Sequence, residues 1–132
     1  MVRYQGACHC KAIIFEVEAP SDLVVFKCNC SICHIKQNHH FIIPESAFTL
    51  ISGSEELTEY RFNTKVAVHL FCKICGVQSF YRPRSNPDGF GINIYSIDTS
   101  PASSITFTTF DGQNWESTME NSDIKKYSQS NI

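Results

Sequence analysis

The sequence contains no apolar run that approaches the ~18 consecutive residues of a membrane-spanning helix. It also has no surplus of charge of one sign, because 11 Lys and Arg residues stand against 13 Asp and Glu residues, for a formal net charge of -2. A dedicated nucleic-acid-binding module needs a basic surface to neutralise phosphates, so this function class is disfavoured. Glycine-rich phosphate loops, dinucleotide fingerprints and the Ser-His-Asp order of serine hydrolases are absent as well.

A secretory signal is also missing. The apolar run Ile13-Ile14-Phe15 near the N-terminus is too short for the core of a signal peptide. We therefore expect a soluble protein of a reducing compartment, located in the cytoplasm and, as a second option, also in the nucleus. No membrane partner is expected.

The hydrophobic pattern predicts mainly β structure. Apolar and polar residues alternate with the two-residue period of a half-buried strand over 13–18, 58–63, 66–71 and 105–108. Continuous apolar runs at 23–26 and 40–43 predict short strands that are buried on both faces. Trp115 and Met119, four residues apart, predict one short helix after Asp111, and a second helical turn is expected after Cys30.

The length of 132 residues and the apolar fraction of 42% predict one domain with a real hydrophobic core. We expect the domain to span residues 1–132, with a core over about 4–119 and a loose tail over 122–132. Tyr60, Phe62, Phe80 and Tyr81 are expected to belong to the core.

Cysteine is the residue type that stands out, with seven in the chain. Close-set cysteines in an odd number, without an export signal, indicate metal or redox chemistry rather than a disulfide framework. Cys28, Cys30 and Cys33 lie within six residues and must share one locality, with Cys28 and Cys30 expected on one face of a strand. The remaining four form a Cys-x-Cys pair and a distant Cys-x-x-Cys pair, which together make a tetrahedral thiolate set for Zn²⁺: Cys8, Cys10, Cys72 and Cys75.

The two sets predict different kinds of zinc site. Four thiolates close the coordination shell, as in structural sites, whereas three leave one position for a substrate or a reactive ligand. The alternative for the smaller set is a second structural site completed by a histidine, and His34, His39 and His40 follow it closely in the sequence. One of these histidines is also a candidate proton shuttle. The alternative without a function is that they are solvent-exposed side chains at the start of a strand.

The motifs around these cysteines resemble those of the glutathione-dependent formaldehyde-activating enzyme family. The resemblance covers roughly residues 4–119 and rests on the segments Cys8-His9-Cys10, Cys28-Asn29-Cys30-Ser31-Ile32-Cys33 and Cys72-Lys73-Ile74-Cys75-Gly76. Other segments look most like the animal branch that contains centromere protein V, namely Lys36-Gln37-Asn38, Phe62-Asn63-Thr64 and Gly76-Val77-Gln78-Ser79-Phe80-Tyr81, continuing into Arg84-Ser85-Asn86-Pro87.

This resemblance implies a zinc-stabilised folded β-sheet or sandwich of the β-tent type, with two zinc ions per chain. Cys8, Cys10, Cys72 and Cys75 match the structural ligands of the family, and Cys28, Cys30 and Cys33 match its reactive zinc, beside which glutathione binds. The implied activity is that of a carbon–sulfur lyase, which forms or cleaves adducts such as S-hydroxymethylglutathione. The substrate partner would be glutathione or another small thiol.

Arg82 and Arg84, at the end of the strand expected after Cys75, are candidates to hold the carboxylates of glutathione. A solvated rim is the alternative for both. For the whole chain, one alternative is a non-enzymatic adaptor in which both zinc ions are structural and the surface binds a cytoskeletal or chromosomal protein. The other is a redox sensor, in which oxidation of Cys28, Cys30 and Cys33 releases the metal.

Overall fold

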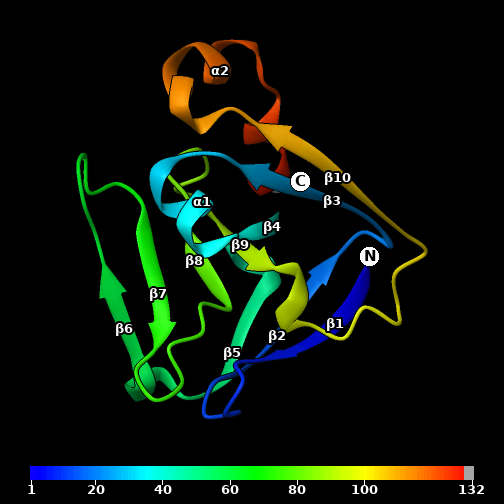
Figure 1. Ribbon diagram of the computed structural model, residues 1–132. Coiled ribbons are helices and arrows are strands. Elements are labelled where there is room, and N and C mark those ends of the chain that lie inside the picture. The colour runs from blue at the N-terminus through cyan, green and yellow to red at the C-terminus, as the bar shows by residue number, and fades with distance from the viewer. Residues whose placement is uncertain (130–132) are drawn as a thin grey trace.

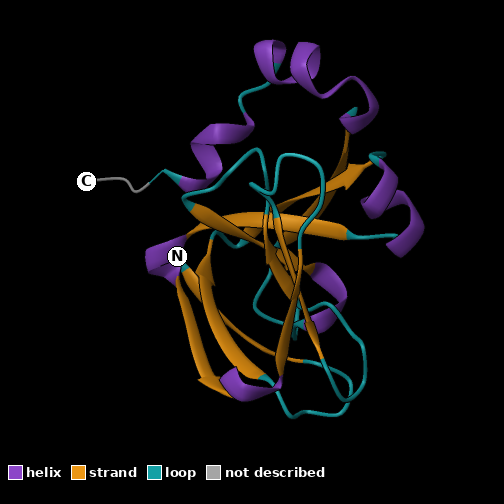
Figure 2. Cartoon of the chain, turned by 90° about the vertical axis from the view of Figure 1, so that its left-hand side faces the viewer, coloured by secondary structure: helices purple, strands orange, loops and turns teal. Residues whose placement is uncertain are grey.

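The computed structural model describes residues 1–129 and has a mainly β fold with few short helices (Figures 1 and 2). The elements within this range are the strands β1 Val2–Ala7, β2 Ile14–Ala19, β3 Asp22–Cys28, β4 His39–Pro44, β5 Phe48–Ser52, β6 Leu57–Tyr60, β7 Val68–Cys72, β8 Phe80–Arg82, β9 Gly89–Asn93 and β10 Ser104–Phe110, and the helices α1 Ser31–Lys36 and α2 Trp115–Asn121. No helix in the described range is long and apolar enough to cross a membrane.

Over residues 1–129 the strands form two sheets. The smaller sheet has the order β1-β2-β5, and the larger has the order β10-β3-β4-β9-β8-β7-β6. Neighbouring strands are antiparallel except β10 and β3, which run parallel with Phe110 opposite Cys28. Because β3 and β10 end at the same edge, the residues after Phe110 arrive beside those after Cys28.

The main core lies between the two sheets. Side chains from the smaller sheet, including Tyr4, Phe15 and Val17, pack in one cluster with side chains from the larger sheet, including Val25 and Phe41. Their inward-facing positions alternate along each strand, as the period of a pleated strand requires. The predicted architecture, a mainly β folded sheet or sandwich, is confirmed.

A second apolar cluster covers the opposite face of β3 and β4. Phe26, Ile42, Phe110 and Ile124 are buried there, and Trp115 of α2 packs against them. Both faces of β3 and β4 are therefore covered, which explains the continuous apolar runs that the sequence shows at these strands. Figure 1 shows α2 and the adjoining C-terminal segment above the β3 and β10 edge of the larger sheet.

The structure corrects the prediction of a loose tail over residues 122–132. Ile124–Ser128 forms a 3₁₀ helix, and Ile124 is only 1% exposed. The Asn86 side chain holds this segment, because its Nδ2 donates to the Ile124 carbonyl oxygen at 3.0 Å and to the Ser128 Oγ at 2.7 Å. One apolar residue and one polar anchor leave no periodic signal in the sequence. Residues 130–132 of the predicted tail lie outside the described residues.

Other expectations also need correction. The strand expected over 58–63 ends at Tyr60, whose side chain is 48% exposed instead of lying in the core. Strands β1, β5 and β9 were not expected from alternation. In β9 the glycines Gly89 and Gly91 weaken the local preference for a strand, and pairing with β4 and β8 on either side overrides it.

Replacing Ile124 by Ala tests whether the C-terminal segment belongs to the fold. We expect the free energy of unfolding to fall by about 2–4 kcal/mol, because the change opens a cavity in the second cluster. Ile51→Ala is the matched control: Ile51 is 54% exposed on β5, and the loss there should stay below about 1 kcal/mol. If urea denaturation shows the same loss of unfolding free energy for both variants, residues 122–129 do not contribute to the fold and the prediction of a loose tail holds for them.

Candidate functional site

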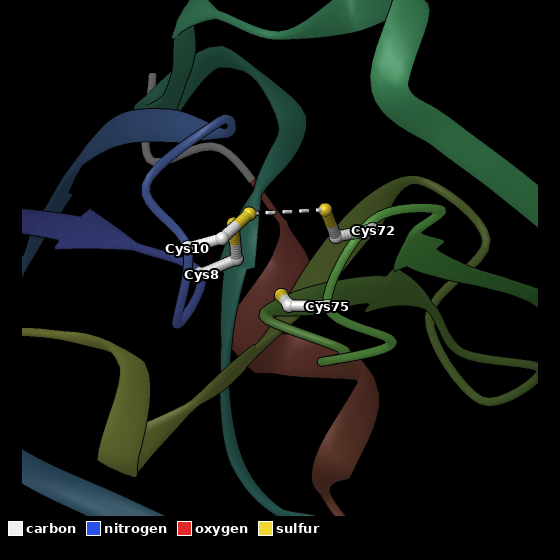
Figure 3. Close-up of side chains that lie close together, drawn as sticks. All are labelled: Cys8, Cys10, Cys72 and Cys75. Carbon is white, nitrogen blue, oxygen red and sulfur yellow. Dashed lines mark hydrogen bonds between the residues drawn. The ribbon is translucent and has the colours of Figure 1, made fainter.

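Four cysteines from two distant segments point at one centre (Figure 3). Cys8 and Cys10 lie just after β1, while Cys72 ends β7 and Cys75 lies in the turn that follows. All four Sγ atoms lie within 4.8 Å of one another, and the Sγ of Cys10 is 3.7 Å from that of Cys8 and 3.7 Å from that of Cys72. The structure thus brings together the four-cysteine set that the sequence predicts.

Backbone amides surround these sulfurs in a way that suits thiolate ligands. The amide of Ile13 donates to the Cys8 Sγ at 3.4 Å, and the amide of Ile74 donates to the Cys72 Sγ at 3.4 Å. Hydrogen bonds from the backbone at Cys10 and Val77 lower the pKa of Cys75 to about 6. Hydrogen bonds to the charged form favour that form, so the donor set fits a soft cation such as Zn²⁺.

The other three cysteines converge at the end of β3. Cys28 is the last residue of that strand, Cys30 directly precedes α1, and Cys33 lies within α1. Their Sγ atoms also lie within 4.8 Å of one another, and the Asn38 Nδ2 donates to the Cys33 Sγ at 3.8 Å. Hydrogen bonds from Cys28 and Cys33 hold the pKa of the Cys30 thiol well below its ordinary value, so the cluster favours a thiolate.

Within residues 1–129, no histidine or carboxylate joins these three sulfurs to complete a fourth ligand. His34 is exposed, and His39 hydrogen-bonds to the Tyr95 hydroxyl at 3.1 Å. His40 lines the same pocket, but none of the three candidate histidines joins the group of ligand atoms that lie within 4.8 Å of one another among the described residues. A metal held by Cys28, Cys30 and Cys33 keeps one position for an external ligand.

The cysteines reach their positions through turns, which corrects the expectation that a Cys-x-Cys pair lies on a strand. Cys8 and Cys10 follow β1 in a turn closed by a hydrogen bond from the Lys11 amide to the Cys8 carbonyl at 3.1 Å. The turn after Cys28 is closed differently, because the Asn29 amide donates to the Phe110 carbonyl of β10 at 3.2 Å. Sequence spacing identified the ligand sets but not the backbone that carries them.

The three-cysteine set lines a pocket of about 400 Å³. Apolar walls come from segments far apart in the chain, with Phe62, Phe110 and Trp115 among them. Gly112 brings the segment after β10 against the sulfurs, because a Cβ at this position would lie 2.6 Å from the Cys28 Sγ. This size and this mixture of apolar walls with a few polar groups are typical of a small-molecule site.

The polar groups of the pocket include two buried histidines and a tyrosine. His40 is 2% exposed, and burial lowers its pKa to about 4, so its imidazole is neutral. Burial, then the charge of the neighbouring sulfur cluster, raises the pKa of Tyr81 well above its ordinary value. His69 stacks on the Tyr81 ring with centroids 5.2 Å apart, and burial lowers its pKa.

Sequence reasoning missed the place of these rings in the pocket. Tyr81 is buried, as expected, but it also lines the pocket, while His40 was expected at a solvated strand start and is a buried pocket residue. The available signal was the position of His40 at the head of the apolar run 40–43, because a histidine in a strand covered on both faces must be buried. His69 gave no comparable signal.

The two candidate arginines separate in the structure. Arg84 lines the pocket and stacks on the Trp115 ring, with its guanidinium carbon 3.6 Å from the ring centroid. Arg82 lies outside the pocket lining, stacks on Phe90 and donates to the carbonyl oxygen of Pro87 at 2.8 Å. Only Arg84 is placed to meet a ligand beside the three sulfurs.

Comparisons with known proteins agree with this arrangement. A crystal structure of a Rhodobacter sphaeroides protein is similar, with a TM-score of 0.66 and 30% sequence identity over 79% of this chain and 99% of that one. The family model described as glutathione-dependent formaldehyde-activating enzyme matches residues 3–113, which include both cysteine sets and the pocket residues up to Gln113. The chain belongs to the glutathione-dependent formaldehyde-activating enzyme family.

Proposed function

We propose that the chain catalyses the reversible joining of glutathione and formaldehyde to S-hydroxymethylglutathione, a carbon–sulfur lyase activity in the cleavage direction. One observation carries this proposal. The sulfurs of Cys28, Cys30 and Cys33 lie within 4.8 Å of one another, lack a fourth protein ligand among residues 1–129, and line a pocket of about 400 Å³. Membership of the family supplies the substrate class.

The donor chemistry of both sites favours zinc. A set of thiolates is soft and suits Zn²⁺ better than the harder cations. Zinc held by Cys28, Cys30 and Cys33 would lower the pKa of a bound thiol and so keep it as the nucleophilic thiolate. In the second set, Cys8, Cys10, Cys72 and Cys75 leave no position for a substrate, so their role is structural.

The chain's own residues orient the substrate. Arg84 is the only Lys or Arg among the described residues that line the pocket, and glutathione carries two carboxylates. A guanidinium binds a carboxylate through paired, charge-assisted hydrogen bonds. Phe62, Phe110 and Trp115 give the pocket apolar walls, and polar contacts are stronger beside such walls than in bulk water. The reaction needs reduced glutathione, so we place the protein in the cytoplasm.

In the forward reaction the sulfur of glutathione forms a bond to the carbonyl carbon of formaldehyde. The π electrons of the C=O bond move to the oxygen, which takes up a proton and becomes the hydroxyl of the adduct. The proton that the thiol loses balances the proton that the oxygen gains. In the reverse direction the carbon–sulfur bond breaks and the thiolate leaves.

Exchange NMR on an equilibrium mixture of glutathione, formaldehyde and the adduct tests the activity. The zinc-loaded protein should accelerate exchange above the spontaneous rate, and the acceleration should saturate with glutathione. Cys30→Ser should abolish it, because a serine hydroxyl stays protonated and is a poor zinc ligand. No acceleration by the wild-type protein would contradict the proposed function and leave the zinc-stabilised adaptor and the redox sensor as the alternatives.

The same substitution in the two cysteine sets should have unequal effects on folding. The four-cysteine set joins β1 to β7, and structural zinc binding is worth on the order of 10 kcal/mol, against a total stability of roughly 5–15 kcal/mol for a domain. We expect Cys72→Ser to be insoluble or largely unfolded. Cys30→Ser should stay folded with about one zinc ion per chain, measured by atomic emission. Equal loss of folding in both variants would make the three-cysteine site structural.

Calorimetric titration of glutathione tests the role of Arg84. We expect Arg84→Ala to weaken binding about 10- to 100-fold, since a charge-assisted hydrogen bond contributes roughly 1.5–3 kcal/mol. The control is Arg3→Ala, because Arg3 pairs with Glu16 on the surface of the smaller sheet and lies outside the pocket. Unchanged affinity in Arg84→Ala, with the melting temperature preserved, would remove this arginine from the site.

A further inference from the structure

A hydrogen-bonded tyrosine and histidine lie in the wall of the pocket. The Tyr81 Oη is 3.0 Å from the His40 Nε2, and the two rings meet edge to face with centroids 5.0 Å apart. Both side chains are buried, with exposed fractions of 5% for Tyr81 and 2% for His40. A buried polar pair of this kind is rigid, because neither partner can turn away without losing its hydrogen bond.

The fold makes room for this pair at one position. Gly91 of β9 lies directly opposite Tyr81 of β8, and β9 also separates β8 from β4, which carries His40. A Cβ at Gly91 would lie 2.6 Å from the Tyr81 Cε1 and 3.0 Å from the His40 Cδ2. The two rings therefore meet across β9 only because this position has no side chain.

Tyr81 differs in its bonding from the other hydroxyl groups of the pocket. Ser31 and Thr64 are exposed, so water competes for their hydroxyls. The Ser85 hydroxyl already donates to the Asn86 Oδ1 at 2.7 Å. The Tyr81 Oη lies 3.0 Å from the Nε2 and 3.4 Å from the Nδ1 of His40, which fixes the hydroxyl beside the sulfur cluster. In the tautomer of His40 that donates to this oxygen, the tyrosine keeps its own hydrogen for a ligand.

The reaction proposed above requires such a donor, because negative charge develops on the formaldehyde oxygen as the carbon–sulfur bond forms. Resting on that function, we propose that Tyr81 is a catalytic residue whose hydroxyl binds this oxygen and passes its hydrogen to it, and that His40 positions the hydroxyl. The hydrogen returns to Tyr81 from solvent, which receives the equivalent proton from the thiol. In adduct cleavage the same oxygen gives the hydrogen back.

Two tyrosines of this chain allow a matched test. Tyr95 also hydrogen-bonds to a histidine, His39, at 3.1 Å, but it is 68% exposed and does not line the pocket. We expect Tyr81→Phe to lower kcat for exchange about 100-fold, as expected for the loss of a general acid, with the glutathione Kd and the zinc content unchanged. Tyr95→Phe should keep the wild-type kcat.

The outcomes separate this proposal from the function on which it rests. If the wild-type protein accelerates exchange and Tyr81→Phe does so equally, the role of Tyr81 is wrong while the proposed function stands. If Tyr81→Phe loses zinc or glutathione affinity together with kcat, its role is structural and the proposal is also wrong. An inactive wild-type protein overturns the function itself.

A pair of variants at His40 tests the positioning role. His40→Leu removes the hydrogen bond to Tyr81, and we expect kcat to fall at least tenfold. His40→Gln keeps an amide donor and should restore part of this loss without changing the zinc content. Equal kcat values in the two variants, with both folded by circular dichroism, would show that the hydrogen bond to Tyr81 has no part in the reaction.

Discussion

The convergence of four thiols from two distant segments is the constraint on which the other features depend. Cys8 and Cys72 are both buried in the main core, and their segments belong to different sheets. Four sulfurs within 4.8 Å cannot all carry charge without a cation among them, so binding of a metal here would be coupled to the packing of the two sheets. Such a metal would give this small domain a cross-link between distant segments that its apolar core alone does not supply.

Because the main core covers one face of the larger sheet, its other face is available for the pocket. One face of β3 and β4 packs into the core, and the other carries the second apolar cluster and the pocket. The sulfurs of Cys28, Cys30 and Cys33 sit at the end of β3 and the beginning of α1. Strands β4, β7 and β8 supply His40, His69 and Tyr81, so these three polar groups of the pocket are held by the sheet, whereas Arg84 lies in the turn after β8.

The local sequence pattern predicted the mainly β class and the two cysteine sets. It did not predict which distant segments pair with one another to form the pocket. Cysteine spacing was sufficient to sort the seven thiols, because metal coordination limits the sets that are chemically complete. The pocket could not be read in this way, since its walls depend on pairings such as His69 with Tyr81 and on the parallel register of β10 with β3. The burial of Ile124 likewise depends on Asn86, a long-range contact without periodicity.

The parallel pairing of β10 with β3 has a consequence for the order in which the molecule is completed during synthesis. The closed cysteine set is complete once residue 75 has left the ribosome, whereas the wall formed by Phe110, Gly112 and Trp115 waits for a segment some 80 residues beyond Cys28. In a nascent chain the four-cysteine set can therefore assemble before Cys28, Cys30 and Cys33 are enclosed. During that interval these three thiols face solvent, and β10 together with the segment after it ends their exposure.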